Sequence, residues 1–217
     1  MKIAACPFPV SPVSAFAAFA DQVCGIVQAS PGQEARLLLL PEYCPMALAT
    51  MFPGPISADL KAQLDALQAQ FVPFEDMLRN LARTHRIVIA GGSFPVRDAD
   101  GRFRNRCTIA TPDGRLLHQD KHRMTRFERE HWGISPGTGN TIVDLGDGIR
   151  MGVAICYDSE FPLLVREQVA AGANLVCVPS CTDSLHGFHR VQVGARARAL
   201  ENQCYVLTAH TIGDLPE

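Results

Sequence analysis

The 217-residue sequence has little charge. Asp, Glu, Lys and Arg make up 19% of its residues, and the formal net charge is −2. Such a chain offers no general affinity for nucleic acid or an anionic membrane, so its expected partner is a small molecule. Hydrophobic residues make up 47%, which excludes an intrinsically disordered chain. We expect residues 1–217 to form one folded domain.

Long hydrophobic runs are also absent. No stretch approaches the roughly 18 apolar residues of a membrane-spanning helix, and residues 1–12 lack the apolar core of a secretion signal. These absences predict a cytoplasmic protein. The eight cysteines form no CxxC pair, so scattered thiols in a reducing compartment fit better than disulfides or a zinc site. There is no internal repeat, and GTGN at 137–140 lacks the context of a phosphate-binding loop.

Two groups of basic residues near the C-terminal end are candidate sites, but each has a simpler interpretation. His186 and His189 lie three residues apart, and we expect them to be loop or substrate-pocket residues rather than metal ligands. Arg196 and Arg198 fall on different faces of a predicted helix. We expect them to pair with carboxylates such as Glu201.

Hydrophobic periodicity predicts strands and helices alternating at both ends of the chain, with an antiparallel meander between them. The expected strands span residues 2–6, 35–40, 87–96, 102–112, 114–121, 141–145, 149–156, 174–180 and 204–210, and the expected helices span 15–29, 57–70, 73–85, 162–173 and 187–203. Pro31 and Gly32 are expected to end the first helix, while 51–55 and 122–140 are expected to be loops. This order of elements favours an α/β layered fold with mixed sheets.

Cys156 stands where the apolar run 149–155 stops and a polar turn leads to Pro162, which suits the first turn of a helix. A thiol between a strand end and a helix start faces free backbone N–H groups and the positive end of the helix dipole. Both effects lower its pKa from about 8.5 toward neutrality, which favours a reactive nucleophile. The alternative is a small buried hydrophobic residue. Asp158 and Glu160 are expected to brace the turn.

Glu42, Lys121 and Cys156 share one feature, because each follows or ends a predicted strand. Active sites are commonly built where strands end at one edge of a sheet. Amide hydrolysis needs a nucleophile, a base and a positive charge for the oxyanion, and these three side chains can fill those roles. Taken singly, Glu42 could be a cap and Lys121 a solvated charge. Their shared placement favours a common site.

The segments LLLLPEY, HQDKHR and GVAICYDSEFP occur in the order and approximate spacing of the nitrilase superfamily, the carbon-nitrogen hydrolases, which the chain therefore resembles. The stretch 179–210 resembles the part that follows the family's cysteine. The resemblance implies a four-layer α-β-β-α sandwich with two mixed sheets, no metal or organic cofactor, and a homodimer or higher homo-oligomer. Members of the family usually continue beyond the strand at 204–210, so it also implies a C-terminally shortened fold.

The resemblance further implies a Glu-Lys-Cys triad, which falls on Glu42, Lys121 and Cys156. Glu42 would be the base and Cys156 the nucleophile. Lys121 and the backbone N–H of Tyr157 would hold the oxyanion.

Many family members have a second glutamate between the lysine and the cysteine, and TRFEREHWG offers Glu128 and Glu130. We favour Glu128, because it lies four residues before Trp132, as in the relatives that this loop resembles most. The alternative is a solvated loop charge. Tyr43, Trp132 and Thr182 are expected to contact the substrate.

Three functions remain open at this point. The first is an amidase that cleaves a small-molecule amide to a carboxylate and ammonia or an amine through a cysteine thioester. The second is a nitrilase that uses the same triad to convert a nitrile to an acid. The third is a truncated, inactive domain that acts through binding or assembly.

Overall fold

The computed structural model of the protein describes residues 1–29 and 34–213. In chain order the elements are β1 (Lys2–Ala5), β2 (Phe8–Pro9), α1 (Phe16–Ala29), β3 (Ala35–Leu40), η2 (Cys44–Met51), α2 (Gly54–Ser57), α3 (Leu60–His85), β4 (Val88–Arg97), β5 (Phe103–Ala110), β6 (Leu116–Asp120), η3 (Glu128–Trp132), β7 (Val143–Asp144), β8 (Arg150–Val153), η4 (Cys156–Glu160), α4 (Pro162–Ala170), β9 (Leu175–Ser180), α5 (Leu185–Asn202) and β10 (Tyr205–Ile212). The expected helix end at Pro31 and Gly32 lies outside the described residues.

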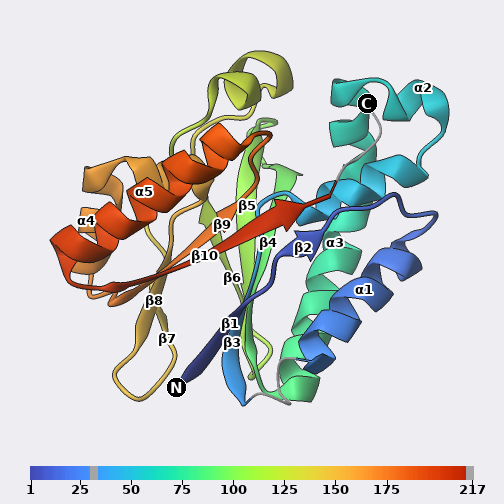
Figure 1. Cartoon of the computed structure of the whole chain (residues 1–217). Coiled ribbons are helices and arrows are strands. Elements are labelled where there is room, and N and C mark those ends of the chain that lie inside the picture. Colours follow the sequence, from blue (N-terminus) through green and yellow to red (C-terminus); the bar gives the residue numbers. More distant parts are fainter. Residues whose placement is uncertain (30–33, 214–217) are drawn as a thin grey trace.

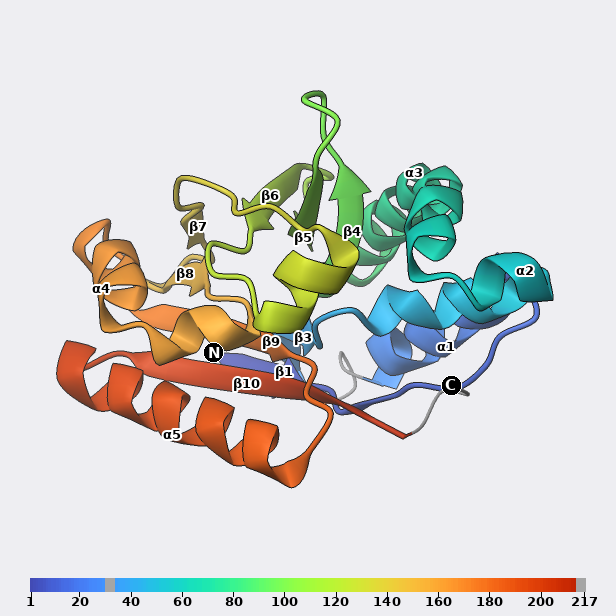
Figure 2. The same ribbon diagram turned by 90° about the horizontal axis from the view of Figure 1, so that it is seen from above.

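Two five-stranded sheets form the centre of the molecule. Their strand orders are β1-β3-β4-β5-β6 and β2-β10-β9-β8-β7. Helices α1 and α3 lie outside the first sheet, and α4 and α5 lie outside the second (Figure 1). Figure 2 shows α5 running alongside β10 on that outer side. The predicted α-β-β-α arrangement is therefore confirmed.

Both sheets are mixed, as predicted. In the first, β1, β3 and β4 are parallel and β4, β5 and β6 form an antiparallel meander. In the second, β2, β10, β9 and β8 are parallel, and β7 pairs with β8 antiparallel. The parallel strands are joined by helical crossovers, as parallel pairing requires.

The four consecutive leucines of β3 show how the layers are held together. Side chains alternate between the two faces of a strand. Leu38 and Leu40 therefore lie in the core beneath α1 and α3, whereas Leu37 and Leu39 lie in the core between the two sheets. A strand covered on both faces needs apolar residues at every position, and this explains the unbroken hydrophobic run.

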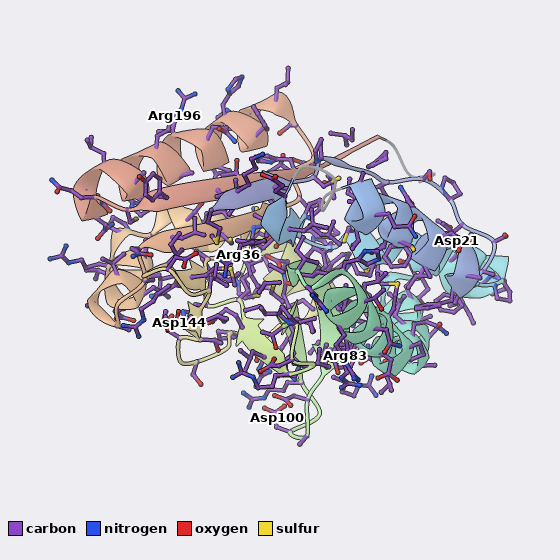
Figure 3. The ribbon with its side chains drawn as sticks, turned by 90° about the horizontal axis from the view of Figure 1, so that it is seen from below. Asp21, Arg36, Arg83, Asp100, Asp144 and Arg196 are labelled. Atoms are coloured by element: carbon purple, nitrogen blue, oxygen red, sulfur yellow. The ribbon has the colours of Figure 1, made fainter. Side chains whose placement is uncertain are left out.

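A polar link also joins strand β3 of the first sheet to the turn between β7 and β8 of the second. Arg36 of β3 donates a hydrogen bond to the Leu145 carbonyl at 2.9 Å and pairs with the Asp147 carboxylate. Both acceptors lie in the turn between β7 and β8. Figure 3 labels Arg36 and, on this hairpin, Asp144. The hairpin that precedes Cys156 is thus tied to the first sheet.

One helix replaces the two that the sequence predicted at 57–70 and 73–85. Helix α3 runs through Pro73 without ending. Proline removes one backbone hydrogen bond and disfavours a helix interior, but both halves bury the same face, with Leu64 and Leu67 before Pro73 and Phe74 after it. Continuous burial outweighs the local cost. None of the helices in the described ranges, α3 included, is long and apolar enough to cross a membrane.

Short helical turns occupy parts of the segments expected to be loop or strand, and they also occur where no element was predicted. The 3-10 turn η2 occupies 44–51 and α2 occupies 54–57, and the polar segment 122–140 contains the π-helical turn η3. Strand β8 ends at Val153, so Cys156 lies in η4 rather than at the last strand position. Sequence periodicity did not predict these turns, because tertiary contacts can override local propensity.

The predicted pairing is confirmed for Arg198, whereas no ion pair of Arg196 is recorded among the described residues. Arg196 is exposed on the outer side of α5 (Figure 3), whereas Arg198 is buried and pairs with Glu201. Arg198 also donates to the Ser159 carbonyl at 3.1 Å. The buried arginine therefore fixes η4 against α5.

Candidate active site

The structure brings Glu42, Lys121 and Cys156 together. Glu42 lies two residues past β3, Lys121 directly follows β6, and Cys156 begins η4 just beyond β8. The Lys121 Nζ atom is 2.7 Å from Glu42 Oε1, and the Cys156 thiol lies close enough to Glu42 for that carboxylate to influence its pKa, while its Sγ atom contacts the Cys181 carbonyl at 3.7 Å. All three side chains are buried. Three segments that are distant in the sequence therefore form one cluster between the two sheets.

Glu128 joins this cluster and Glu130 does not. Lys121 Nζ lies 2.7 Å from Glu128 Oε2, and Glu128 is 3% exposed. Thr125 donates to the same Oε2 atom from its backbone N–H at 2.8 Å and from its hydroxyl at 2.9 Å. Glu130 is exposed and pairs with Arg126. Of the two glutamates, the structure places Glu128 where it can act on Lys121.

The turn that carries Cys156 is braced from several sides. Asp158 accepts hydrogen bonds from the backbone N–H groups of His122 and Arg123, with a shortest distance of 2.7 Å. The Ser159 hydroxyl donates to the Cys156 carbonyl at 2.7 Å. Cys156 itself has a φ of +48°, in the left-handed region that L-residues avoid. These contacts hold the backbone of Cys156 in a conformation that an isolated turn would not keep.

The expected lowering of the Cys156 pKa is wrong. Burial of the thiol raises its pKa well above the ordinary value, and the neighbouring Glu42 charge raises it further, while Lys121 opposes them. Helix α4 begins only at Pro162, after η4. The dipole of a helix acts mainly within its first turn, so a contribution from α4 to the Cys156 pKa is not expected. Cys156 is a thiol at rest and needs a base in order to react.

The ionisation of the three charged groups follows from their contacts. Burial raises the pKa of Glu42, and the Lys121 charge offsets this only in part. For Glu128, burial also acts upward, but Lys121 and the Thr125 and Asn105 hydrogen bonds bring the net pKa below its usual value. Burial alone would lower the pKa of Lys121, yet the two carboxylates raise it. Lys121 is charged, Glu128 is a carboxylate, and Glu42 is the group positioned to exchange a proton.

The cluster lies at the base of a cavity of about 550 Å³. The predicted substrate contacts Tyr43, Trp132 and Thr182 all line it, as does Tyr157. The Tyr43 hydroxyl is already committed, because it donates to Glu128 Oε1 at 2.9 Å. The Tyr43 and Trp132 rings meet edge to face with centroids 4.9 Å apart. This volume and an aromatic wall suit a small organic substrate.

Three participants were not predicted from the sequence. Asn105 of β5 donates to both Glu42 and Glu128 at 2.9 Å. The Cys181 backbone N–H donates to Glu42 Oε2 at 3.0 Å. For Thr125 a signal was present, because Thr125 and Glu128 have the spacing of a helix capping box, S/T-x-x-E. Nothing local marks the other two, since their contacts come from separate strands.

The two histidines considered as metal ligands lie elsewhere. His186 and His189 lie on helix α5 rather than in the expected loop, and they do not line the cavity. They line an adjoining surface hollow, which shares Arg190 and Glu160 with the rim of the cavity. Within residues 1–29 and 34–213, no group of three or more His, Cys, Asp or Glu side chains is arranged to hold a metal ion.

Residues 2–216 match the carbon-nitrogen hydrolase family, and the chain belongs to that family. A probable hydrolase of Bacillus subtilis, YhcX, is 29% identical over 222 residues, which are 100% of this chain and 41% of that protein. The omega-amidase NIT2-B of Xenopus laevis is 29% identical over 89% of this chain and 69% of its own length. The chloroplastic omega-amidase of Arabidopsis thaliana is 31% identical, over 87% and 51%. The chain thus spans between about two fifths and two thirds of the length of these relatives.

Solved structures share the fold. Nit3 of Saccharomyces cerevisiae, a member of the nitrilase superfamily, aligns with a TM-score of 0.76 at 23% identity, covering 98% of this chain and 76% of its own. An amidase from Nesterenkonia sp. aligns with a TM-score of 0.74 at 24% identity, covering 97% and 76%. The two-sheet architecture is therefore that of the nitrilase fold.

Proposed function

We propose that this chain hydrolyses a carbon–nitrogen bond in a small amide, releasing a carboxylate and ammonia or an amine through a thioester on Cys156. The observation that carries the proposal is the buried Lys121 ammonium, bonded to both Glu42 and Glu128 beside the thiol, at the base of a cavity. The omega-amidases among the relatives support an amide as the substrate.

The first half of the reaction forms the thioester. Glu42 takes the proton of Cys156 as the sulfur attacks the amide carbon, and the carbonyl electron pair moves onto oxygen. Lys121 and the backbone N–H of Tyr157 stabilise this oxyanion, since fixed donors in a dry site act more strongly than water. The oxyanion then collapses, and Glu42 returns the proton to the departing nitrogen. A base whose pKa lies above the ordinary carboxyl value suits the first transfer, because it takes up the thiol proton more readily.

The second half releases the acid. A water molecule loses a proton to Glu42 and attacks the thioester carbon, and the sulfur leaves as the thiol when that proton returns to it. Glu128 takes no proton in this scheme. Its lowered pKa keeps it anionic, so it holds the Lys121 ammonium in position and charged.

Cys156→Ala tests the proposal. A panel of small amides is screened for ammonia release with the wild-type chain, and the variant is assayed on any substrate found. We expect kcat to fall by roughly 10³-fold or more, because the variant lacks the thiol that forms the thioester. Cys24→Ala is the control, since Cys24 lies on α1 and does not line the cavity. Full activity of Cys156→Ala would exclude this mechanism.

The two other functions predict different outcomes. A nitrilase would turn over a nitrile faster than the matching amide, so the pair is assayed side by side. An inactive binding domain would hydrolyse neither compound. Its Cys156 would also react with a small thiol reagent no faster than the other seven cysteines, as measured by intact mass.

The homodimer implied by the family resemblance is part of this proposal. Sedimentation of the full chain tests it, with a monomer mass as the contradicting result. Exposed apolar side chains on α4, α5 and β10, namely Leu163, Val193, Leu200 and Tyr205, support such an association.

A further inference from the structure

Asn105 occupies an unusual position between the two carboxylates. It lies on β5 and is fully buried. Its Nδ2 atom is 2.9 Å from Glu42 Oε1 and 2.9 Å from Glu128 Oε1, so each hydrogen of one amide group serves a different acid. Its backbone carbonyl accepts from the Lys121 N–H at 2.8 Å. Asn105 therefore fixes both the spacing of the two acids and the backbone position of Lys121.

These contacts divide the two oxygens of Glu42. Oε1 accepts from Lys121 Nζ at 2.7 Å and from Asn105 Nδ2 at 2.9 Å. A carboxylate oxygen has two lone pairs, so Oε1 is saturated. Oε2 accepts from the Cys181 backbone N–H at 3.0 Å, and among the described residues no second N–H or O–H donor is recorded for it. Oε2 is thus the oxygen with room for the proton of Cys156.

The chemistry of an amide side chain suits this task. A neutral amide donates to a carboxylate without titrating itself, so it cannot compete for the proton. A second cation at this place would favour the charged form of Glu42 and weaken it as a base. The Asn105 Oδ1 atom is buried and has no partner among the described residues. The donor end of the side chain is therefore the part that the site uses.

We propose that Asn105 is a positioning residue for the reaction: together with Lys121 it saturates Glu42 Oε1 and directs the proton of Cys156 to Oε2, while it keeps Glu128 as an acceptor. The inference rests on the proposed function. The proton leaves Sγ as the S–C bond forms, resides on Oε2, and passes from Oε2 to the nitrogen as the C–N bond breaks.

Asn105→Leu removes both donors with little change in size. We expect the acidic limb of the kcat/KM profile to move upward by about one pH unit, because a lost hydrogen bond to a carboxylate favours its protonated form. We also expect kcat at neutral pH to fall roughly tenfold or more. The matched control is Asn202→Leu. Asn202 is also buried, donates from Nδ2 to the Arg198 carbonyl and the Glu201 carboxylate, and has an unpartnered Oδ1, but it contacts neither Glu42 nor Glu128.

A pH-dependent alkylation of Cys156 provides a second readout that needs no substrate. Iodoacetamide labelling is followed by intact mass, with Cys156→Ala to identify the site. The acidic limb of the labelling rate should shift upward in Asn105→Leu and stay in place in Asn202→Leu. If no amide is turned over but this limb shifts, the proposed function fails and the role of Asn105 stands.

An unmoved limb in a folded, active Asn105→Leu variant would overturn the inference and leave the amidase proposal intact. If the leucine variant does not fold, Asn105→Asp replaces it, since aspartate has the same shape but offers at most one hydrogen. The limb should again shift upward, and an unchanged limb in that variant would equally reject the role of Asn105.

Discussion

The base of the cavity and its rim both contain ion pairs, but they differ in burial. At the base, Lys121 is 1% exposed and Glu42 2%. At the rim, the side chains of Arg190 and Glu160 are 46% and 23% exposed, although their shortest contact is a similar 2.8 Å. Distance alone therefore does not distinguish them. Removing one partner of a buried pair leaves an uncompensated charge, whereas water replaces the partner at the rim.

The largest effect is expected for Lys121→Met, which removes the cation at the base. Glu42 and Glu128 would then face each other without compensation, and the free energy of unfolding should fall by about 3–5 kcal/mol. The loss should shrink as the pH falls, because protonation ends the repulsion between the two carboxylates. Urea unfolding at several pH values measures both effects.

The control for that variant is Lys61→Met, which removes an exposed lysine near the start of α3. Its expected change is within about 0.5 kcal/mol. Equal losses in the two variants would show that the burial of Lys121 does not increase its contribution to stability.

A smaller effect is expected for Glu128→Gln. The variant keeps the shape of the side chain but removes one charge beside Lys121, which should cost about 1–3 kcal/mol and lower kcat by roughly 10²-fold. The folded-state pKa of Glu128 is below its ordinary value. The stability that its charge provides is therefore complete above the unfolded pKa of about 4.3 and is lost as the pH falls through the folded value.

Glu130→Gln is the matched control, two residues away in the same turn. Glu130 is exposed and pairs only at the surface, so its loss should change stability by about 0.5 kcal/mol or less and leave kcat nearly unaltered. A kcat loss as large as that of Glu128→Gln would contradict the choice of Glu128 over Glu130 as the second carboxylate.

The smallest effect is expected for Arg190→Gln at the rim. The pair with Glu160 is partly solvated, so the change should be about 0–1 kcal/mol and should nearly vanish at about 1 M salt. Urea unfolding at low and high salt measures it. A salt-insensitive loss comparable to that of Lys121→Met would contradict the division between base and rim.

Several features could be predicted because their signals are local. The alternation of leucines in β3, the turns between β4, β5 and β6, and the amphipathic helices follow from short-range periodicity. The positions of Glu42, Lys121 and Cys156 beside strand ends were also readable, and the structure brings these side chains together. Pro73 misled the prediction, because local propensity is weaker than the burial shared by both halves of α3.

Other features depend on groups that only folding brings together. The pKa of Cys156 was predicted to fall and instead rises, since burial and the Glu42 charge outweigh a helix end that lies further along the chain. Asn105 reads in the sequence as an ordinary polar residue of a strand. Its contacts with Glu42 and Glu128 join residues 63 and 23 positions away.

The sequence by itself determined the layered α/β architecture and the three side chains proposed for the chemistry, because strand patterns and motif spacing are properties of neighbouring residues. Only the tertiary structure decided which glutamate joins Lys121, how each acid is ionised, and which oxygen of Glu42 is left open. Those outcomes depend on burial and on donors from separate segments, and hydrogen-bond geometry exists only once the two sheets have packed together.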